Sequence, residues 1–110
     1  MAALVLQLVE EGRLTLDDPL STWLPDFPNI DNRTTIRQLL NHTSGIYDYV
    51  KHPDSPFQMA YKSTKTWTQE QILLELVEQP YFSPGSGWHY STTNYILLRL
   101  IAEKATGSNV

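Results

Sequence analysis

The chain has 110 residues, the size of one domain or part of one, and its 41% hydrophobic and 11% aromatic content is typical of a folded globular protein. A formal net charge of −4 provides no basic surface for nucleic acid, and no apolar run reaches the roughly 18 residues of a membrane span. The lack of cysteine excludes disulfides and thiolate sites, and the three histidines lack metal-ligand spacing, so we expect no metal and no cofactor.

The first quarter of the chain predicts two helices. Residues 2–11 are apolar at nearly every position before two glutamates, which is typical of a helix buried on all sides, and Gly12 is a good residue to end it. Asp18 and Pro19 match the N-cap and first residue of a short helix that ends at Leu24.

Two capping boxes predict the next helices. Thr-Ile-Arg-Gln at 35–38 opens a helix that we expect to run through His42, and Thr-Gln-Glu-Gln at 68–71 opens another that stops at Pro80. Between them, residues 47–66 contain two prolines and mixed polarity. We expect a long surface excursion there, with one helical turn.

A turn at Pro84 and Gly85 begins an aromatic loop that presents Tyr90 just before a strongly apolar helix over residues 93–105. Three hydroxyl residues at 91–93 stand where the free N–H groups of that helix need side-chain acceptors, and Gly107 should end it. The chain as a whole is predicted to be mainly α, with at most short strands.

Three blocks carry a family resemblance: LQLVEEGRLTLDDPL at 6–20, TIRQLLNHTSGI at 35–46 and FSPGSGWHYSTTNYILL at 82–98. They resemble, in order and at plausible spacing, the serine β-lactamase-related family of class C β-lactamases, D-alanyl-D-alanine carboxypeptidases and related esterases. The resemblance implies the α/β fold of β-lactamases and transpeptidases. Residues 1–110 would be a partial domain, its helical region, with the central sheet largely missing.

The resemblance implies acyl transfer through a serine, in which a Ser-x-x-Lys supplies the nucleophile, a Tyr-x-Asn shuttles its proton and a Lys/His-x-Gly binds substrate. It places the catalytic tyrosine on Tyr90 and the motif's asparagine position, a substrate-binding position, on Thr92. A hydroxyl lacks the paired donor and acceptor of an amide, which disfavours β-lactam turnover and leaves an esterase-like role open.

The other two motifs do not occur in the 110 residues: no serine has a lysine three positions later, and there is no Lys-Thr-Gly or His-x-Gly. In the family the nucleophile segment lies just before the block that matches residues 1–11. We therefore expect a fragment of a serine hydrolase that is inactive alone, whose complete fold acts on a small-molecule or peptide-like substrate. The family is commonly bacterial and extracytoplasmic, but the sequence shows no signal-peptide pattern, so localisation is left open.

Each candidate residue also has a structural interpretation. Tyr90 could anchor the loop to the core, and the Thr92 hydroxyl could cap a helix. Ser44 beside His42 suggests a nucleophile and base, but helix termination before Gly45 explains that segment better. We expect Trp88 and Tyr95 to pack, and Asn94, two residues beyond Thr92, to point in another direction than Thr92.

A second hypothesis is a non-catalytic helical binding or assembly module. In the complete fold, other elements would cover the helix over residues 2–11. Without them, several hundred Å² of apolar surface would be exposed, which soluble monomers rarely tolerate. Self-association through this face is therefore expected.

Overall fold

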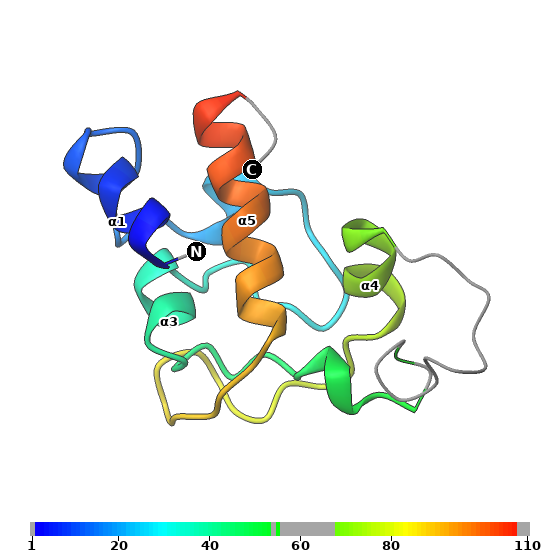
Figure 1. Ribbon diagram of the computed structural model, residues 1–110. Helices are drawn as coiled ribbons and strands as arrows, with labels where there is room; N and C mark the ends of the chain where they lie inside the picture. Colours follow the sequence, from blue (N-terminus) through cyan, green and yellow to red (C-terminus); the bar gives the residue numbers. More distant parts are fainter. Residues whose placement is uncertain (1, 54, 56–67, 108–110) are drawn as a thin grey trace.

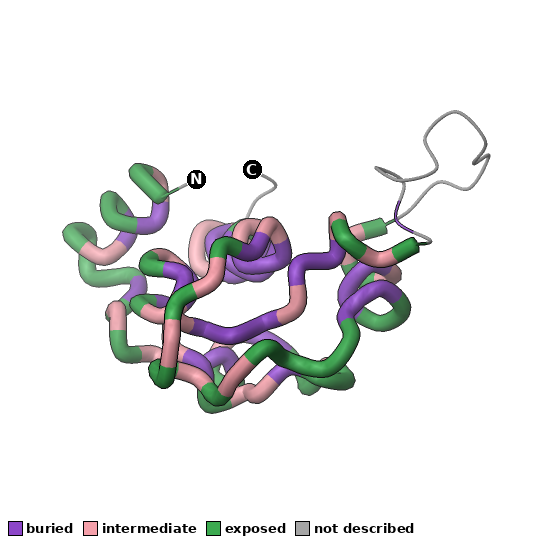
Figure 2. Tube along the Cα trace, turned by 90° about the horizontal axis from the view of Figure 1, so that it is seen from below, coloured by how far each residue is buried: buried purple, intermediate pink, exposed green. Residues whose placement is uncertain are grey.

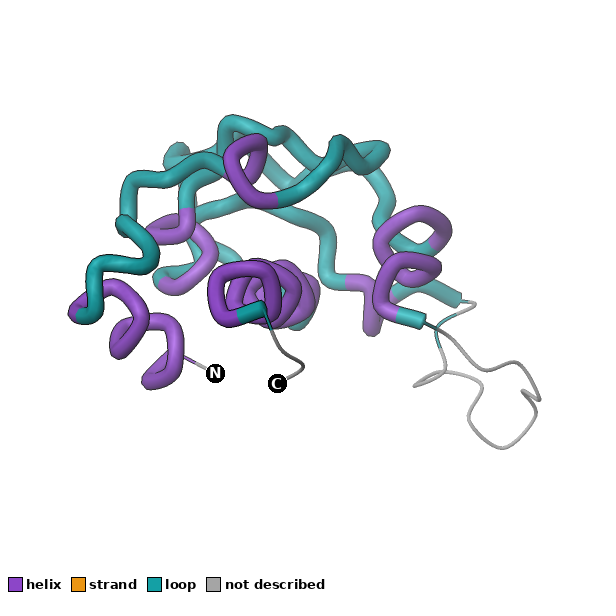
Figure 3. Tube along the Cα trace, turned by 90° about the horizontal axis from the view of Figure 1, so that it is seen from above, coloured by secondary structure: helices purple, strands orange, loops and turns teal. Residues whose placement is uncertain are grey.

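The computed structural model describes residues 2–53, 55 and 68–107. Within these ranges the chain forms helices and loops but no strand, and Pro19 and Thr35 make an isolated antiparallel bridge (Figure 3). The predicted mainly α fold is confirmed. The helices are α1 (Ala2–Glu10), α2 (Leu20–Trp23), α3 (Ile36–Leu40), a 3-10 turn (Tyr49–Lys51), α4 (Gln69–Glu75) and α5 (Thr93–Thr106).

Helix α5 occupies the centre of the molecule. Figure 1 shows α1 and α3 on one side of it and α4 on the other, and both α1 and α3 contact it. Its side chains from Ile96 to Ala102 are buried except at Arg99, because an apolar helix gains most by being surrounded on several sides. It ends as predicted at Gly107, which takes the left-handed conformation with φ +72°.

Helix α1 is not buried on all sides; it exposes apolar surface, as expected for this helix without the elements that would cover it in the complete fold. Only Val5 and Leu8 are buried, whereas Leu6 is 47% exposed. The outer turns of α1 consist largely of exposed residues (Figure 2). The helix therefore packs on α5 through one stripe, and its opposite apolar face is uncovered among the described residues.

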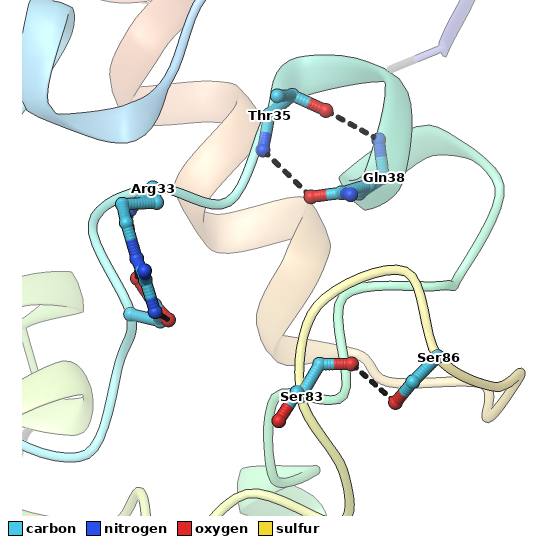
Figure 4. Close-up of polar contacts among 6 residues, drawn as sticks. Arg33, Thr35, Gln38, Ser83 and Ser86 are labelled. Carbon is cyan, nitrogen blue, oxygen red and sulfur yellow. Dashed lines mark hydrogen bonds and ion pairs between the residues drawn. The ribbon is translucent and has the colours of Figure 1, made fainter.

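Both predicted capping boxes are confirmed. The Thr35 hydroxyl accepts from the Gln38 amide, and the Gln38 side chain accepts from the Thr35 amide (Figure 4); Thr68 and Gln71 repeat the arrangement. The ends differ from those expected. Helix α3 stops at Leu40 rather than His42, since His42 has φ +60°, and α4 stops at Glu75, well before Pro80.

The start of α2 corrects another expectation. Pro19 is the N-cap residue and makes no side-chain cap bond. The carboxylate of Asp18 instead turns back to accept from the Thr15 amide and hydroxyl and from the Trp23 indole. The Thr15 hydroxyl bond lowers the pKa of Asp18 most, against the raising effect of burial. Asp18 therefore orders the turn before α2 and bonds to a side chain of the helix, but it does not cap the helix N-terminus.

The excursion over 47–66 contains the single turn of 3-10 helix, Tyr49–Lys51, as predicted. Residues 54 and 56–66 lie outside the described residues. The described part is less superficial than expected, because Asp48 and Tyr49 are buried.

Candidate functional site

The loop that carries Tyr90 begins with a turn that closes on itself. Gly85 has φ +84°, and both the amide and the hydroxyl of Ser86 donate to the Ser83 carbonyl, at 3.0 and 2.7 Å (Figure 4). A Pro-Gly pair suits this geometry because proline fixes one φ and glycine accepts a positive one. The sequence prediction of a turn is confirmed.

Backbone bonds then attach this loop to the segment that follows α3. Three of its amides donate to carbonyls of residues 42–45, so the loop follows that segment closely from one end to the other. Backbone bonds cannot be replaced by a rotamer change, and they define the position of the loop firmly. The bonds are Tyr81 N to Gly45 O (2.8 Å), Gly85 N to Thr43 O (2.7 Å) and His89 N to His42 O (3.0 Å).

Gly45 permits this close approach. It has φ +77°, and a Cβ atom at this position would overlap the carbonyl oxygen of Phe82. A side chain here would separate the two segments. Gly45 was expected to terminate a helix, but α3 already ends at Leu40; the close contact of Gly45 with Phe82 is a constraint that the sequence did not reveal.

Tyr90 lies at the end of the loop, three residues before α5. Its side chain is 48% exposed, and its ring centroid lies 4.6 Å from that of His42. The ring of Tyr95, on the first turn of α5, is 6.1 Å away. Tyr90 therefore rests on an aromatic support and still reaches solvent, an arrangement compatible with anchoring and with chemistry.

The hydroxyl residues before α5 do not cap it, contrary to the sequence expectation. Thr92 is the N-cap residue but has helical φ and ψ and makes no side-chain cap bond. The Ser91 hydroxyl is buried without a hydrogen-bond partner in the described part of the chain. The Thr93 hydroxyl accepts from Tyr49 N (3.0 Å) and donates to Tyr47 O (2.7 Å), so it fastens the 47–49 segment to α5.

Thr92 and Tyr90 have different surroundings. Thr92 is half-buried and lines an open cavity of about 550 Å³ between α4 and α5, together with Tyr95 and Arg99. Tyr90 faces His42 instead. Tyr95 links the two, since its ring contacts Tyr90 and also lines the cavity that Thr92 borders.

A buried polar network lies beneath Tyr90. Ser44 Oγ donates to Asn94 Oδ1 at 2.8 Å, Asn94 Nδ2 lies 3.1 Å from His42 Nδ1, and His42 Nε2 lies 3.3 Å from the Tyr95 hydroxyl. Ser44 and Asn94 are fully or almost fully buried, and His42 is 9% exposed. Burial lowers the pKa of His42, because a charged imidazole loses hydration there.

Comparison with known proteins decides to which family the chain belongs. The β-lactamase family matches the chain over residues 1–110. The chain belongs to the β-lactamase family. Penicillin-binding protein 4* of Bacillus subtilis (strain 168) is 41% identical over 106 residues, which are 94% of this chain and 22% of that protein. Esterase EstB of Burkholderia gladioli is 36% identical over 118 residues, covering 97% of this chain and 30% of that protein.

Solved structures agree. A D-stereospecific amidohydrolase from Streptomyces sp. superposes with a TM-score of 0.80 at 41% identity, over 97% of this chain and 35% of that one. The resemblance inferred from the three sequence blocks is confirmed: the chain is similar to serine hydrolases of this family, in the helical part of the β-lactamase fold. It spans about a fifth to a third of the length of these relatives.

The network of Ser44, Asn94 and His42 was missed by sequence reasoning. Ser44 was interpreted as part of a helix end, and Asn94 only as a residue that points in another direction than Thr92. A usable signal existed, because Asn94 lies in the first turn of α5, just before the apolar run at 96–98, and a buried amide requires partners. The partners themselves are 50 and 52 residues away in the sequence, and no local pattern identifies them.

The remaining expectations concern packing, metals and membranes. Tyr95 packs against the core, whereas Trp88 is 66% exposed and meets His42 only edge-on, so packing does not account for Trp88. The described residues contain no group of histidine and acidic side chains able to hold a metal ion. Within the same part of the chain, no helix combines the length and apolar character needed to cross a bilayer.

Proposed function

We propose that this chain provides the tyrosine corner of an acyl-serine hydrolase, with Tyr90 as the proton shuttle. The observation that carries the proposal is the position of Tyr90: half-exposed, three residues before the central helix, on a loop fixed by three backbone bonds. The match to the β-lactamase family over residues 1–110 supports it. Because Ser-x-x-Lys and Lys/His-x-Gly do not occur in these 110 residues, the chain alone is expected to be inactive.

The chemistry assigned to Tyr90 is proton transfer in both directions. As the serine oxygen bonds to the substrate carbonyl carbon, Tyr90, acting as the phenolate, accepts the serine proton and becomes a phenol. When the bond to the leaving group breaks, the same oxygen donates that proton to the departing amine or alcohol. Water then attacks the acyl-serine, its proton passes through the same site, and the acid product leaves as the serine is restored.

Thr92, two residues after Tyr90, is proposed to bind substrate in a cavity whose described lining does not include Tyr90 but does include Tyr95, whose ring contacts Tyr90. The Thr92 side chain borders this open cavity between α4 and α5, as a substrate-contacting residue must. A hydroxyl offers one donor and lacks the amide's fixed pair, which favours an ester over an amide that needs both. We therefore propose small esters as the favoured class among the small-molecule and peptide-like substrates, as the name of the similar Esterase EstB also suggests.

The test requires the missing motifs to be supplied. This chain would replace the matching segment of Bacillus subtilis penicillin-binding protein 4*, and intact mass and rate would report acylation by a penicillin and by a p-nitrophenyl ester. Tyr90→Phe should slow acylation by about 10² to 10⁴-fold, the usual contribution of general acid–base catalysis. Tyr47→Phe, which removes a phenol from the 47–49 segment, is the matched control and should keep the rate.

Thr92→Asn in the same chimera should shift the preference from the ester towards the penicillin, since it restores the amide. A chimera that melts like its parent and is acylated equally fast with Phe at position 90 would contradict the proposed role of Tyr90.

The second candidate, a non-catalytic assembly module, is favoured by the exposed apolar face of α1 and by Leu74, which is 52% exposed. An octameric penicillin-binding protein homologue from Pyrococcus abyssi is 29% identical and superposes with a TM-score of 0.72, over 26% of that chain. Under this alternative the chimera shows no Tyr90-dependent acylation, while the isolated chain forms a defined oligomer in light scattering that Leu6→Glu dissociates.

A further inference from the structure

We propose that His42 is the positioning residue for Tyr90: a neutral imidazole with its proton on Nε2 supports the phenol ring and, through Nδ1, holds the loop backbone at Ser91. The claim that His42 affects catalysis rests on the proposed role of Tyr90. The claim that His42 holds Tyr90 in place rests only on the geometry around His42, and the two claims can be tested separately.

The tautomer follows from the donors that face the imidazole. The backbone amide of Ser91 points at His42 Nδ1 from 3.4 Å, and a backbone N–H can only donate. Nδ1 must therefore be an acceptor, without a proton of its own. In a neutral ring the proton then lies on Nε2, which faces the Tyr95 hydroxyl at 3.3 Å.

Ser44 and Asn94 support the same assignment. The Ser44 hydroxyl accepts from Ile46 N, so its proton is free to go to Asn94 Oδ1 at 2.8 Å. This orients the Asn94 amide so that Nδ2, a donor, faces His42 Nδ1 at 3.1 Å. Two N–H groups thus converge on Nδ1. A proton on Nδ1 would repel both of them and leave them without an acceptor in a buried site.

The backbone of His42 contributes as well. With φ +60° it turns its carbonyl towards the loop, where it accepts from His89 N at 3.0 Å. His42 therefore holds the loop at His89 through its carbonyl and at Ser91 through its ring. The residue between these two attachments is Tyr90, whose ring lies against the imidazole at 4.6 Å.

Such an arrangement would matter to a proton shuttle. A side chain that must meet a serine oxygen at hydrogen-bond distance loses about 100-fold in rate when displaced by about 1 Å. A half-exposed tyrosine on an unsupported loop would sample several rotamers. His42 restricts both the backbone on either side of Tyr90 and the plane of its ring.

The first measurement uses the unmodified 110-residue chain. A long-range ¹H–¹⁵N correlation spectrum at pH 7.5 should show His42 Nδ1 without a proton and Nε2 with one. A proton on Nδ1 would overturn the inference, and this result requires no variant to fold.

Two variants then separate the two contacts of the ring. His42→Asn keeps an acceptor near Ser91 N and tolerates the left-handed φ, but it removes the ring. Protection of the Ser91 amide should persist, while the Tyr90 ring signals move towards those of a free tyrosine. His42→Phe keeps a ring and loses the acceptor, so the opposite pattern is expected. Unchanged Tyr90 signals in His42→Asn would contradict the positioning role.

The chimera supplies the catalytic readout. His42→Asn should lower kcat for the ester on the order of 10- to 100-fold with little change in KM, because substrate binding does not use His42. If Tyr90→Phe slows acylation and His42→Asn does not, His42 is not the positioning residue and the role of Tyr90 stands. If neither change has an effect, the proposed function fails, and the spectra of the chain still decide whether His42 holds Tyr90.

Discussion

The segments that follow α1 and α3 share one backbone feature and differ in what surrounds it. Each contains a glycine in the left-handed region: Gly12, two residues after α1, has φ +78°, and Gly45, five residues after α3, has φ +77°. A Cβ atom added at Gly12 would meet no neighbouring side chain or backbone within 4 Å, whereas at Gly45 the Phe82 carbonyl fills that space. The same backbone conformation therefore serves an open turn in one place and a tight junction in the other.

The two regions also differ in the kind of interaction that attaches them to the rest of the chain. Helix α1 meets α5 through an apolar stripe that contains Val5 and Leu8, and apolar contacts tolerate small shifts because they have no direction. The junction beyond α3 is joined to α5 and to the loop over residues 81–91 by directional hydrogen bonds, several of them buried. The region with directional bonds is the one that lies beneath Tyr90, where the proposed proton transfer would require precise placement.

The largest expected effect comes from adding one methyl group at each glycine. Gly12→Ala should cost roughly 1–2 kcal/mol, the usual penalty of a left-handed alanine. Gly45→Ala carries the same penalty and must also displace Phe82, so we expect a loss of more than about 3 kcal/mol. Urea unfolding of the two variants checks this, and equal losses would remove the distinction between the two regions.

A smaller effect is expected from pH. Burial lowers the pKa of His42 in the folded chain, while the unfolded chain keeps the ordinary value of 6.5. The stability contributed by neutral His42 is therefore complete above pH 6.5 and is lost as the pH falls from there to the lowered folded pKa, because only the unfolded state then binds the proton. Urea midpoints at pH 7.5 and 5.5 should differ more in the unmodified chain than in His42→Asn.

This experiment also separates the two regions, because α1 contains no histidine. A His42→Asn chain with the same pH dependence as the unmodified chain would show that the junction does not depend on a neutral imidazole.

The elements that sequence reasoning predicted correctly are those specified within a few residues. The capping boxes at Thr35 and Thr68, the Pro84–Gly85 turn and the end of α5 at Gly107 each depend on side chains no more than four positions away. Such signals are present in the printed sequence. The family resemblance added the helical part of a known fold, and with it the position proposed for the catalytic tyrosine.

The errors arose where distant segments compete for the same groups. The hydroxyl of Thr93 was expected to cap α5. It instead accepts a hydrogen bond from the amide of Tyr49 and donates one to the carbonyl of Tyr47, and these two residues lie 44 and 46 positions earlier in the sequence. Asn94 and His42 meet across 52 positions. The apolar sequence of α1 is typical of a helix buried on all sides, but the face that no described element covers is exposed, as expected for this helix without the rest of the fold, because burial depends on what covers a face and not on the face alone.

The smallest expected effect concerns Ser91, whose buried hydroxyl has no hydrogen-bond partner among the described residues. Removing an unsatisfied oxygen leaves no donor or acceptor stranded, so Ser91→Ala should keep the free energy of unfolding or raise it by up to about 1 kcal/mol. Ser44→Ala is the matched control: it strands the Ile46 amide and Asn94 Oδ1 in the same junction and should cost about 1–3 kcal/mol. Equal losses of unfolding free energy in the two variants would mean that the Ser91 hydroxyl does have a hydrogen-bond partner. Every polar group of the junction would then be held by a directional bond, unlike the apolar stripe of α1.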